Sequence, residues 1–352
     1  MAALWVSLLI LTTLAIFHHS KAQLSPKNLL ESSTSHYNPI YEKLDVFQKG
    51  KYQVTNPINV KKLQQYSAPE PLLIISPKEA GFYPVLFFIH GTMILNQDYS
   101  ELFKHIASHG YIVVAPKLFD MLLPSEAEEI EKAALVLNWL PSNLQTVLQH
   151  HVNGAIKVDL QLLAVSGHSR GGKSAFALAL GMSTTKISAL IGVDPVAGRD
   201  NHTREEPYVL TYKRDSFNIS FPVTVIGTGL GSSGLFVCAP ANVSHHQFFE
   251  ECKDGSHFVI TKYGHMQMLN DLLLDPIAVA MSGFCKCGFG LKSTMRRTLG
   301  GIMVAFLDTY FKGEKAEYFA LMDNPSLAPT SLIVEKKGNI GFALTSMLKF
   351  SA

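Results

Sequence analysis

The sequence predicts an α/β fold with a mainly parallel, doubly wound sheet and helices on both faces, and three observations support this prediction. Short, continuous apolar runs recur along the chain, as in strands that are covered on both faces. Stretches with helical spacing of apolar residues separate these runs. Strand and helix alternate in this order, which is typical of parallel sheets built from crossover connections.

The start and end of each pattern give the bounds of the predicted elements, taken here in chain order. Residues 52–65 and 71–76 carry alternating or β-branched apolar residues, which predicts two antiparallel entry strands. Continuous apolar runs predict buried strands at residues 84–89, 111–115, 162–165, 187–193, 221–227 and 257–261, with the last of these as the final strand. Helical spacing predicts helices at residues 98–109, 126–151 (interrupted around Pro141) and 294–311. The tail from residue 325 gives no signal.

Length and composition favour one large domain. The chain has 352 residues, of which 47% are hydrophobic, and a formal net charge of +2. It can therefore bury a sizeable core, and it has no basic excess that would indicate nucleic-acid binding. No linker rich in Pro, Gly or Ser divides it. We expect a signal peptide at residues 1–22, a flexible arm at 23–44 and one folded domain at 45–352, with no indication of oligomeric state.

The first residues have the pattern of a secretory signal peptide. Residues 4–17 are almost wholly apolar, and Ser20 and Ala22 lie where a signal peptidase requires small residues. The run is shorter than the ~20 residues that cross a bilayer, so a membrane anchor is the weaker interpretation. The segment lacks Arg, which argues against an organelle transit peptide. We expect secretory-pathway localisation (endoplasmic reticulum, vacuole or cell exterior) and no transmembrane segment in the mature chain.

The glycosylation triplets and the cysteines are consistent with the secretory pathway. The acceptor asparagines are Asn201, Asn218 and Asn242. Four cysteines allow three pairings, and we expect Cys238 to pair with Cys252 because they bracket one polar, turn-prone insertion. The alternative is that all four are reduced. Cys285 and Cys287 have no partner pair at the spacing of a zinc finger, so the sequence indicates no zinc site.

One motif carries the chemistry. Gly-His-Ser-Arg-Gly at residues 167–171 lies between a strand-like run and a helical run, which is the context of the nucleophile elbow of an α/β-hydrolase. Gly167 and Gly171 flank a turn that leaves no room for side chains, and Ser169 is the candidate nucleophile. The alternative is an ordinary glycine-rich turn before a core helix.

A serine nucleophile needs a base and an acid, which follow it in that fold in the order Ser, acid, His. His265 suits the base because it follows the final predicted strand, and His257, at the other end of the same strand, is its rival. No carboxylate follows residues 221–227, so Asp194 is the candidate acid, although it could merely cap a turn before Pro195. The weaker alternatives are Asp215, Asp254 and Asp271.

The remaining parts of such a site are an oxyanion hole and a substrate wall. The backbone N–H groups of Thr92, after the strand at residues 84–89, and Arg170 are placed to hold an oxyanion. Residues 93–95 and 118–123 follow strand ends on the active face, and could wall an apolar cleft or simply pack under helices. The proposed wall consists of Met93, Ile94, Leu95, Leu118, Phe119, Met121, Leu122 and Leu123. Neither a metal nor an organic cofactor is implied.

Several motifs in register resemble the plant chlorophyllases. They are Ile-His-Gly-Thr-Met at 89–93, Gly-His-Ser-Arg-Gly-Gly-Lys at 167–173, Gly-Val-Asp-Pro at 192–195, Lys-Tyr-Gly-His-Met at 262–266 and Thr-Met-Arg-Arg-Thr-Leu-Gly-Gly at 294–301. The resemblance extends from about residue 45 nearly to the end. It implies hydrolysis of the phytyl ester of chlorophyll to chlorophyllide and phytol by Ser169, Asp194 and His265, with magnesium belonging to the substrate. A broad carboxylesterase or lipase, and a non-catalytic protein that binds apolar ligands, are the alternatives.

Overall fold

The computed structural model describes residues 44–61, 68–119, 123–152, 156–200, 202–203, 205–273 and 276–338. The strands of these ranges are β1 (Ile58–Val60), β2 (Leu72–Ile75), β3 (Gly81–Ile89), β4 (Ile112–Pro116), β5 (Ile156–His168), β6 (Ala189–Val193), β7 (Val223–Thr228), β8 (Gly255–Ile260) and β9 (Leu332–Lys337). The helices are α2 (Ser100–Ser108), α3 (Glu126–His151), α4 (Arg170–Ala177), α5 (His245–Glu251), α6 (Pro276–Phe284), α7 (Lys292–Leu307) and α8 (Ala316–Asp323).

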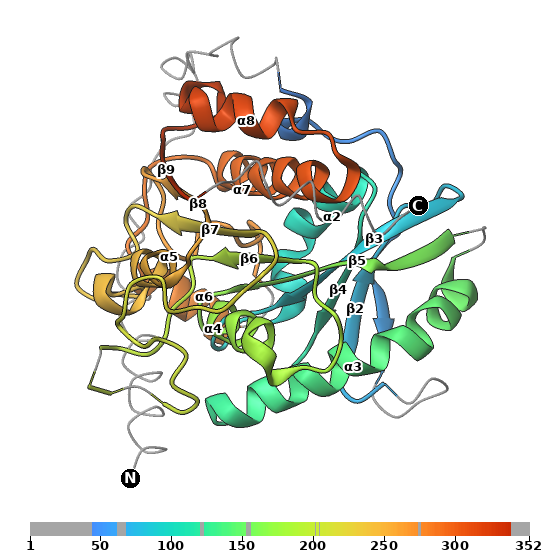
Figure 1. The fold of residues 1–352 in the computed structure, drawn as a ribbon, viewed down its shortest axis with the longest axis horizontal. Helices are drawn as coiled ribbons and strands as arrows, with labels where there is room; N and C mark the ends of the chain where they lie inside the picture. Colours follow the sequence, from blue (N-terminus) through green and yellow to red (C-terminus); the bar gives the residue numbers. More distant parts are fainter. Residues whose placement is uncertain are drawn as a thin grey trace, which may run out of the picture. The chain divides into compact units, whose positions relative to one another are not determined.

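The described strands form one sheet in the order β1-β2-β4-β3-β5-β6-β7-β8-β9 (Figure 1). Strands β3 to β8 pair in parallel, whereas β1, β2 and β9 pair antiparallel with their neighbours. The predicted fold class is therefore confirmed. The carboxyl ends of β5, β6 and β8 lie along one edge, where loops that follow parallel strands form sites.

Two apolar cores lie on opposite faces of this sheet, because successive side chains of a strand alternate between its faces. In β3, Leu86 and Phe88 face one core, and Val85 and Phe87 face the other. Helices α2, α7 and α8 cover the first core, and α3, α4 and α5 cover the second (Figure 1). Because both faces are covered, the central strands are apolar throughout, which is why their sequence showed continuous rather than alternating runs.

Helix α3 passes through Pro141 without the predicted interruption. A proline has no N–H to donate to the carbonyl four residues earlier, which here belongs to Leu137. The Thr185 hydroxyl donates to that carbonyl at 3.3 Å. A partner from a distant loop therefore replaces the missing intrahelical bond, and the helix continues to His151.

The two ends of the sheet also differ from the prediction. The first entry strand is limited to Ile58–Val60, and residues 62–67 lie outside the described part. At the other end, β8 is not the final strand, because β9 pairs with it from Leu332 to Lys337. This edge strand has a short apolar run followed by charged residues, and none of its residues is fully buried, so its sequence gave no strand signal.

The disulfide joins Cys238 to Cys285, with their Cα atoms 5.6 Å apart, so the expected Cys238–Cys252 pair is wrong. Cys252 is buried in the core on the α5 face of the sheet, whereas Cys285 belongs to the core on the opposite face and Cys238 packs against it. The sheet therefore separates the two cysteines that are close in sequence. Cys252 and Cys287 are free thiols.

The remaining predictions about the chain ends and its surface have mixed outcomes. The signal peptide and all but the last residue of the flexible arm lie outside the described residues, as does Asn201. Asn218 and Asn242 are both exposed. None of the described helices has the length and apolar character needed to cross a membrane.

Candidate active site

The nucleophile elbow joins β5 to α4. Ser169 lies between them with φ 58° and ψ −126°, a left-handed conformation that non-glycine residues rarely adopt. A Cβ on Gly167 would lie 2.1 Å from the carbonyl oxygen of Gly171, and one on Gly171 would lie 2.3 Å from that of His90. Both positions therefore require glycine. The tight turn places the Ser169 hydroxyl at the end of the strand, where it faces the loops beyond β6 and β8.

Three side chains that are far apart in sequence meet at this turn. The Ser169 Oγ lies 2.8 Å from Nε2 of His265, and Nδ1 of His265 lies 2.7 Å from Oδ2 of Asp194. All three side chains are at least nine-tenths buried. The geometry is that of a serine, a base that can accept its proton, and a carboxylate that orients the base.

Asp194 follows β6 directly and adopts φ 40°. Its Oδ2 accepts a 2.5 Å hydrogen bond from the Thr228 hydroxyl, and its Oδ1 accepts one of 3.1 Å from the Thr228 N–H. Thr228 ends β7, the strand after which this fold most often places its acid. At the end of β7 the chain therefore has a threonine hydroxyl instead of a carboxylate. This hydroxyl binds the carboxylate of Asp194 from the neighbouring strand β6, so the hydrogen-bonded chain is complete.

The surroundings keep Asp194 ionised. Complete burial would raise its pKa, but hydrogen bonds and charge from His265, the proximity of His245 and the Thr228 hydroxyl outweigh this and hold the pKa well below its ordinary value. His245 Nε2 lies 3.8 Å from Asp194 Oδ1, beyond hydrogen-bond distance. Burial lowers the pKa of His245 to about 3, so this imidazole is neutral at pH 7.

A second hydrogen-bonded chain fastens the loops around the serine. The Gly91 N–H donates to the Tyr99 hydroxyl at 3.0 Å, and Tyr99 lies 2.7 Å from Nδ1 of His168. His168 Nε2 donates to the backbone carbonyl of His265 at 3.0 Å, so the Tyr99 hydroxyl must donate to the other ring nitrogen. Burial lowers the pKa of His168 far below its ordinary value, which keeps the ring neutral in this role. The chain connects the predicted oxyanion loop to the loop of the base.

Of the two predicted oxyanion donors, Arg170 is next to the nucleophile in sequence, and Thr92 lies near it in space. Arg170 is the first residue of α4, and N–H groups in the first turn of a helix have no partner within that helix. Thr92 follows Gly91, whose Cβ, if present, would lie 3.1 Å from the Cβ of Ser169. The assignment of both N–H groups to an oxyanion hole stays a prediction.

The side chains of Arg170 and Lys173 have a different use. Arg170 donates to the Pro124 carbonyl at 2.6 Å and pairs with Glu129 at 3.0 Å, while Lys173 pairs with Glu126. These buried pairs fix the start of α3 against α4. Burial raises the pKa of Glu129 to about 7, although the Arg170 charge opposes that rise. The charged residues after the serine therefore clamp the segment that precedes α3.

The other candidate residues for the base and the acid form contacts elsewhere in the structure. His257 is fully buried and bonds His245 and Glu335, away from Ser169. Asp215 pairs with Lys337, and Asp271 with Arg296. Thr228, Tyr99 and His245 were not predicted. For Thr228, its place directly after a predicted strand was the one signal in the sequence.

Only some residues of the predicted substrate wall are exposed. Ile94 and Leu118 are buried in the two opposite cores, which is a packing role rather than a lining role. The ring of Phe119, whose residue is partly exposed, lies 5.1 Å from that of His90, and Leu123 is exposed. Met93 and Leu95 are partly exposed, and Met121 and Leu122 lie outside the described residues. Ile94 and Leu118 are therefore removed from the wall, and the other members stay a prediction.

One family model and several known proteins are similar to this chain. The family model described as Chlorophyllase matches residues 42–338. Chlorophyllase type 0 of Chenopodium album is 60% identical over 349 residues, which cover 96% of this chain and 98% of the relative. Chlorophyllase-1 of Arabidopsis thaliana is 42% identical over 81% of this chain and 90% of its own length. A chloroplastic chlorophyllase-1 of Citrus unshiu is 43% identical over 82% and 87%.

Proposed function

The chain belongs to the chlorophyllase family and is therefore a hydrolase that acts on esters. From this premise we propose that it cleaves the phytyl ester of chlorophyll, giving chlorophyllide and phytol, through a serine nucleophile. The observation that carries the proposal is the continuous hydrogen-bonded chain from Ser169 through His265 to Asp194. A protein that only bound pigment would have no need for this arrangement.

The geometry gives each side chain one task. His265 Nε2 takes the proton of Ser169 as the hydroxyl oxygen attacks the ester carbonyl. Asp194 accepts the hydrogen bond of Nδ1–H, which holds the ring in the reactive tautomer and stabilises the imidazolium that forms. The backbone N–H groups of Thr92 and Arg170 then donate to the oxyanion. His265 returns the proton to the phytol oxygen, and water releases chlorophyllide from the serine by the same steps.

The direct test is the conversion of chlorophyll by the purified full chain. Chlorophyllide is much more polar than chlorophyll because it lacks the phytyl chain, so partition between hexane and aqueous acetone measures the product. We expect Ser169→Ala to lower kcat on the order of a thousandfold or more. The matched control is Ser331→Ala, an exposed serine before β9, which should retain the full rate.

The same assay separates the chlorophyll ester from simpler esters. A broad carboxylesterase would hydrolyse p-nitrophenyl butyrate with a higher kcat/KM than chlorophyll, and this result would contradict the proposed substrate. Full activity of Ser169→Ala on both esters would contradict the proposed nucleophile instead.

We also propose that Phe119 and Leu123 contact the apolar pigment. Both lie in the segment that leads into α3, which Arg170 holds through the Pro124 carbonyl. Two surface cavities of about 500 and 490 Å³ are lined by other residues, near Thr55 and Val46. Leu123→Ser should lower kcat/KM for chlorophyll by about thirtyfold, since burial of a leucine contributes roughly 2 kcal/mol, and should spare p-nitrophenyl butyrate. Equal losses on both esters would exclude this contact.

Secretory localisation is a further part of the proposal. Structural disulfides persist in oxidising compartments, and the Cys238–Cys285 bond supports that environment. The exposed Asn218 and Asn242 are accessible to glycosylation. Treatment of protein from plant cells with a glycosidase should reduce its mass, and N-terminal sequencing should begin at Gln23. An unglycosylated chain recovered from intact plastids would contradict this localisation.

A further inference from the structure

Three histidines gather beside the catalytic acid, on elements that the proposed reaction does not use. His245 and His246 begin α5, and His257 lies in β8. One ring nitrogen of each lies within 4.8 Å of one from both others. His245 and His257 are buried and His246 is exposed, so the cluster reaches the surface at one ring.

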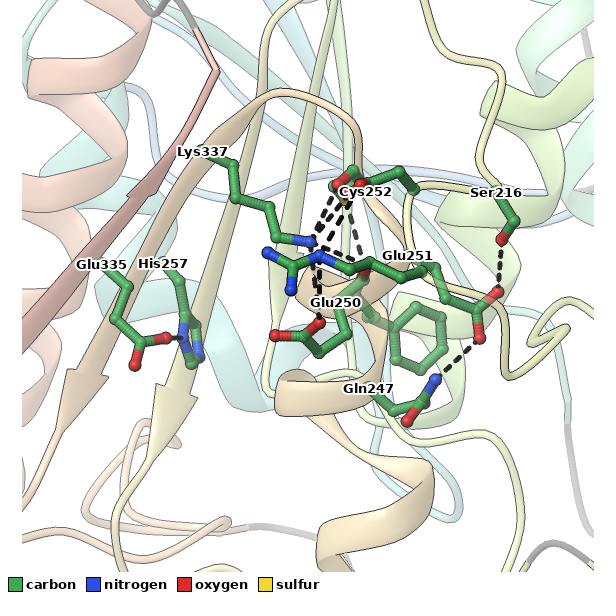
Figure 2. Close-up of polar contacts among 11 residues, drawn as sticks. Ser216, Gln247, Glu250, Glu251, Cys252, His257, Glu335 and Lys337 are labelled. Carbon is green, nitrogen blue, oxygen red and sulfur yellow. Dashed lines mark hydrogen bonds and ion pairs between the residues drawn. The ribbon is translucent and has the colours of Figure 1, made fainter.

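Two of these imidazoles form a line between two carboxylates. At the outer end, Nδ1 of His257 lies 2.9 Å from Oε2 of Glu335, and Figure 2 shows the two side chains facing each other between β8 and β9. In the middle, Nε2 of His257 lies 2.8 Å from Nδ1 of His245. At the inner end, Nε2 of His245 lies 3.8 Å from Oδ1 of Asp194.

This line has one proton too few for its contacts. A neutral imidazole carries one N–H, and ionised carboxylates donate none, so two neutral rings supply two protons for three contacts. With protons toward Glu335 and in the middle, the inner contact has two acceptors, which agrees with its length of 3.8 Å. With both protons toward the carboxylates, two ring lone pairs would face each other at 2.8 Å, and a cation would be needed between them.

We propose that His245, His246 and His257 form a binding site for a divalent transition metal such as Zn²⁺. The ligand atoms are Nδ1 of His245, Nε2 of His257 and a ring nitrogen of His246. The metal takes the place of the middle proton, which lets His257 Nδ1–H donate to Glu335 and His245 Nε2–H donate to Asp194. Imidazole nitrogens suit zinc, and ligating histidines commonly donate their second N–H to a carboxylate.

The two buried ligand nitrogens require only a small adjustment. Zinc binds imidazole nitrogen at about 2.0–2.1 Å, so two ligands at a tetrahedral angle lie roughly 3.3 Å apart. The two buried nitrogens are 2.8 Å apart and must separate by about half an ångström. Space for His245 is provided by Gly227 of β7, where a Cβ would lie 2.2 Å from Nδ1 of His245.

The elements that supply the ligands are held in place independently of a metal. Glu251, at the end of α5, accepts hydrogen bonds from Ser216 and Gln247 (Figure 2). Lys337 of β9 donates to the carbonyls of Glu250 and Cys252 and so joins the edge strand to the same helix. These contacts hold the carboxyl end of α5 against the carboxyl end of β9.

Metal binding should act on the reaction through Asp194. A proton moved to His245 Nε2 gives the carboxylate a second imidazole donor, which competes with His265 for its negative charge. The imidazolium that forms at His265 during the reaction is then less stabilised. We expect Zn²⁺ to lower the rate of ester hydrolysis by about fivefold, a modest coupling between two sites.

The test measures the metal first and the activity second. Tag-free full chain is treated with EDTA and titrated with ZnCl₂ by calorimetry, and Co²⁺ absorption reports the coordination directly. We expect one ion per chain. His246→Ala should weaken binding by at least about tenfold, and Glu335→Gln by about 10–100-fold. The matched controls are His202→Ala, another exposed histidine, and Cys287→Ser, which removes the exposed free thiol.

The outcomes separate the parts of the proposal. Absence of saturable binding, or binding that needs Cys287 or His202 rather than His246, would overturn the site. Because calorimetry reports no catalysis, this result is independent of the proposed esterase function. Zinc should slow p-nitrophenyl butyrate hydrolysis by the native chain, but not by His246→Ala relative to that variant's own metal-free rate. Tight binding without slower hydrolysis would overturn the coupling to Asp194.

Discussion

Two histidine–carboxylate chains meet at Asp194, and they differ in how their contacts are filled. In the first, the Ser169 hydroxyl supplies a proton to Nε2 of His265, and His265 supplies one to Asp194, so each contact has one donor and one acceptor. In the second, His245 and His257 lie between Asp194 and Glu335, and one contact lacks a proton. The outermost group makes the difference, because a serine brings a proton and an ionised glutamate does not.

The comparison shows that the same residue types can serve different chemistry. A chain in which every contact holds a proton can transfer one in a concerted reaction, as serine esterases require. A chain that is one proton short can instead take a cation between its two imidazoles. The imidazoles of both chains are buried, so the distinction depends on hydrogen-bond geometry rather than on burial.

The largest expected effect comes from the residue that both chains share. Asp194→Asn keeps the shape of the side chain but places an amide where His265 needs a pure acceptor, which favours the wrong tautomer of the ring. We expect kcat for chlorophyll to fall on the order of 10³- to 10⁴-fold. Zinc should then cause no further slowing. Retention of more than a tenth of the native rate would show that another group orients His265.

An intermediate effect is expected from Thr228, which binds Asp194 but belongs to neither histidine chain. Thr228→Val preserves shape and removes a hydroxyl that donates to a charged acceptor, a bond that contributes about 2 kcal/mol. We expect the unfolding free energy to fall by that amount in urea denaturation and kcat to fall about tenfold. Thr228→Ser restores the donor and should recover most of both. If Thr228→Ser is as impaired as Thr228→Val, the loss comes from packing rather than from the hydroxyl.

The smallest effect is expected from Tyr99, which joins the oxyanion loop to His168 without touching either carboxylate. Tyr99→Phe removes two neutral hydrogen bonds, and we expect kcat/KM to fall about fivefold, which corresponds to about 1 kcal/mol. The control is Tyr318→Phe, a fully buried tyrosine that bonds Ser256 in the opposite part of the same core. It should lose similar stability and keep its rate. Equal rate losses in the two variants would show that Tyr99 contributes only through packing.

Local features made much of the fold and the elbow predictable. The glycines at 167 and 171 are imposed by contacts within a few residues of the turn and with the adjacent strand, and these recur wherever such a turn occurs. Continuous apolar runs identified the central strands because both faces of those strands are covered. Edge strand β9 lacked this signal, since its second half consists of charged residues.

Contacts between distant segments were harder to predict from the sequence. Asp194 was an uncertain choice because its partner Thr228 lies on another strand, 34 residues away. The prediction for Cys238 failed because sequence proximity does not reveal which face of a sheet a residue occupies. The histidines at 245 and 257 looked unrelated until the packing of α5 on β7 and β8 placed their rings in contact.

The sequence by itself determined the order of the parallel strands, the elbow with its serine, and the family to which the chain is similar. These follow from periodicity, glycine sterics and motifs, all of which act over short stretches. Only the tertiary structure decided the disulfide partner, the second donor to Asp194 and the line of imidazoles behind it. Each depends on which side chains meet when separate elements pack against one sheet, and that choice is made by the whole core rather than by any segment of it.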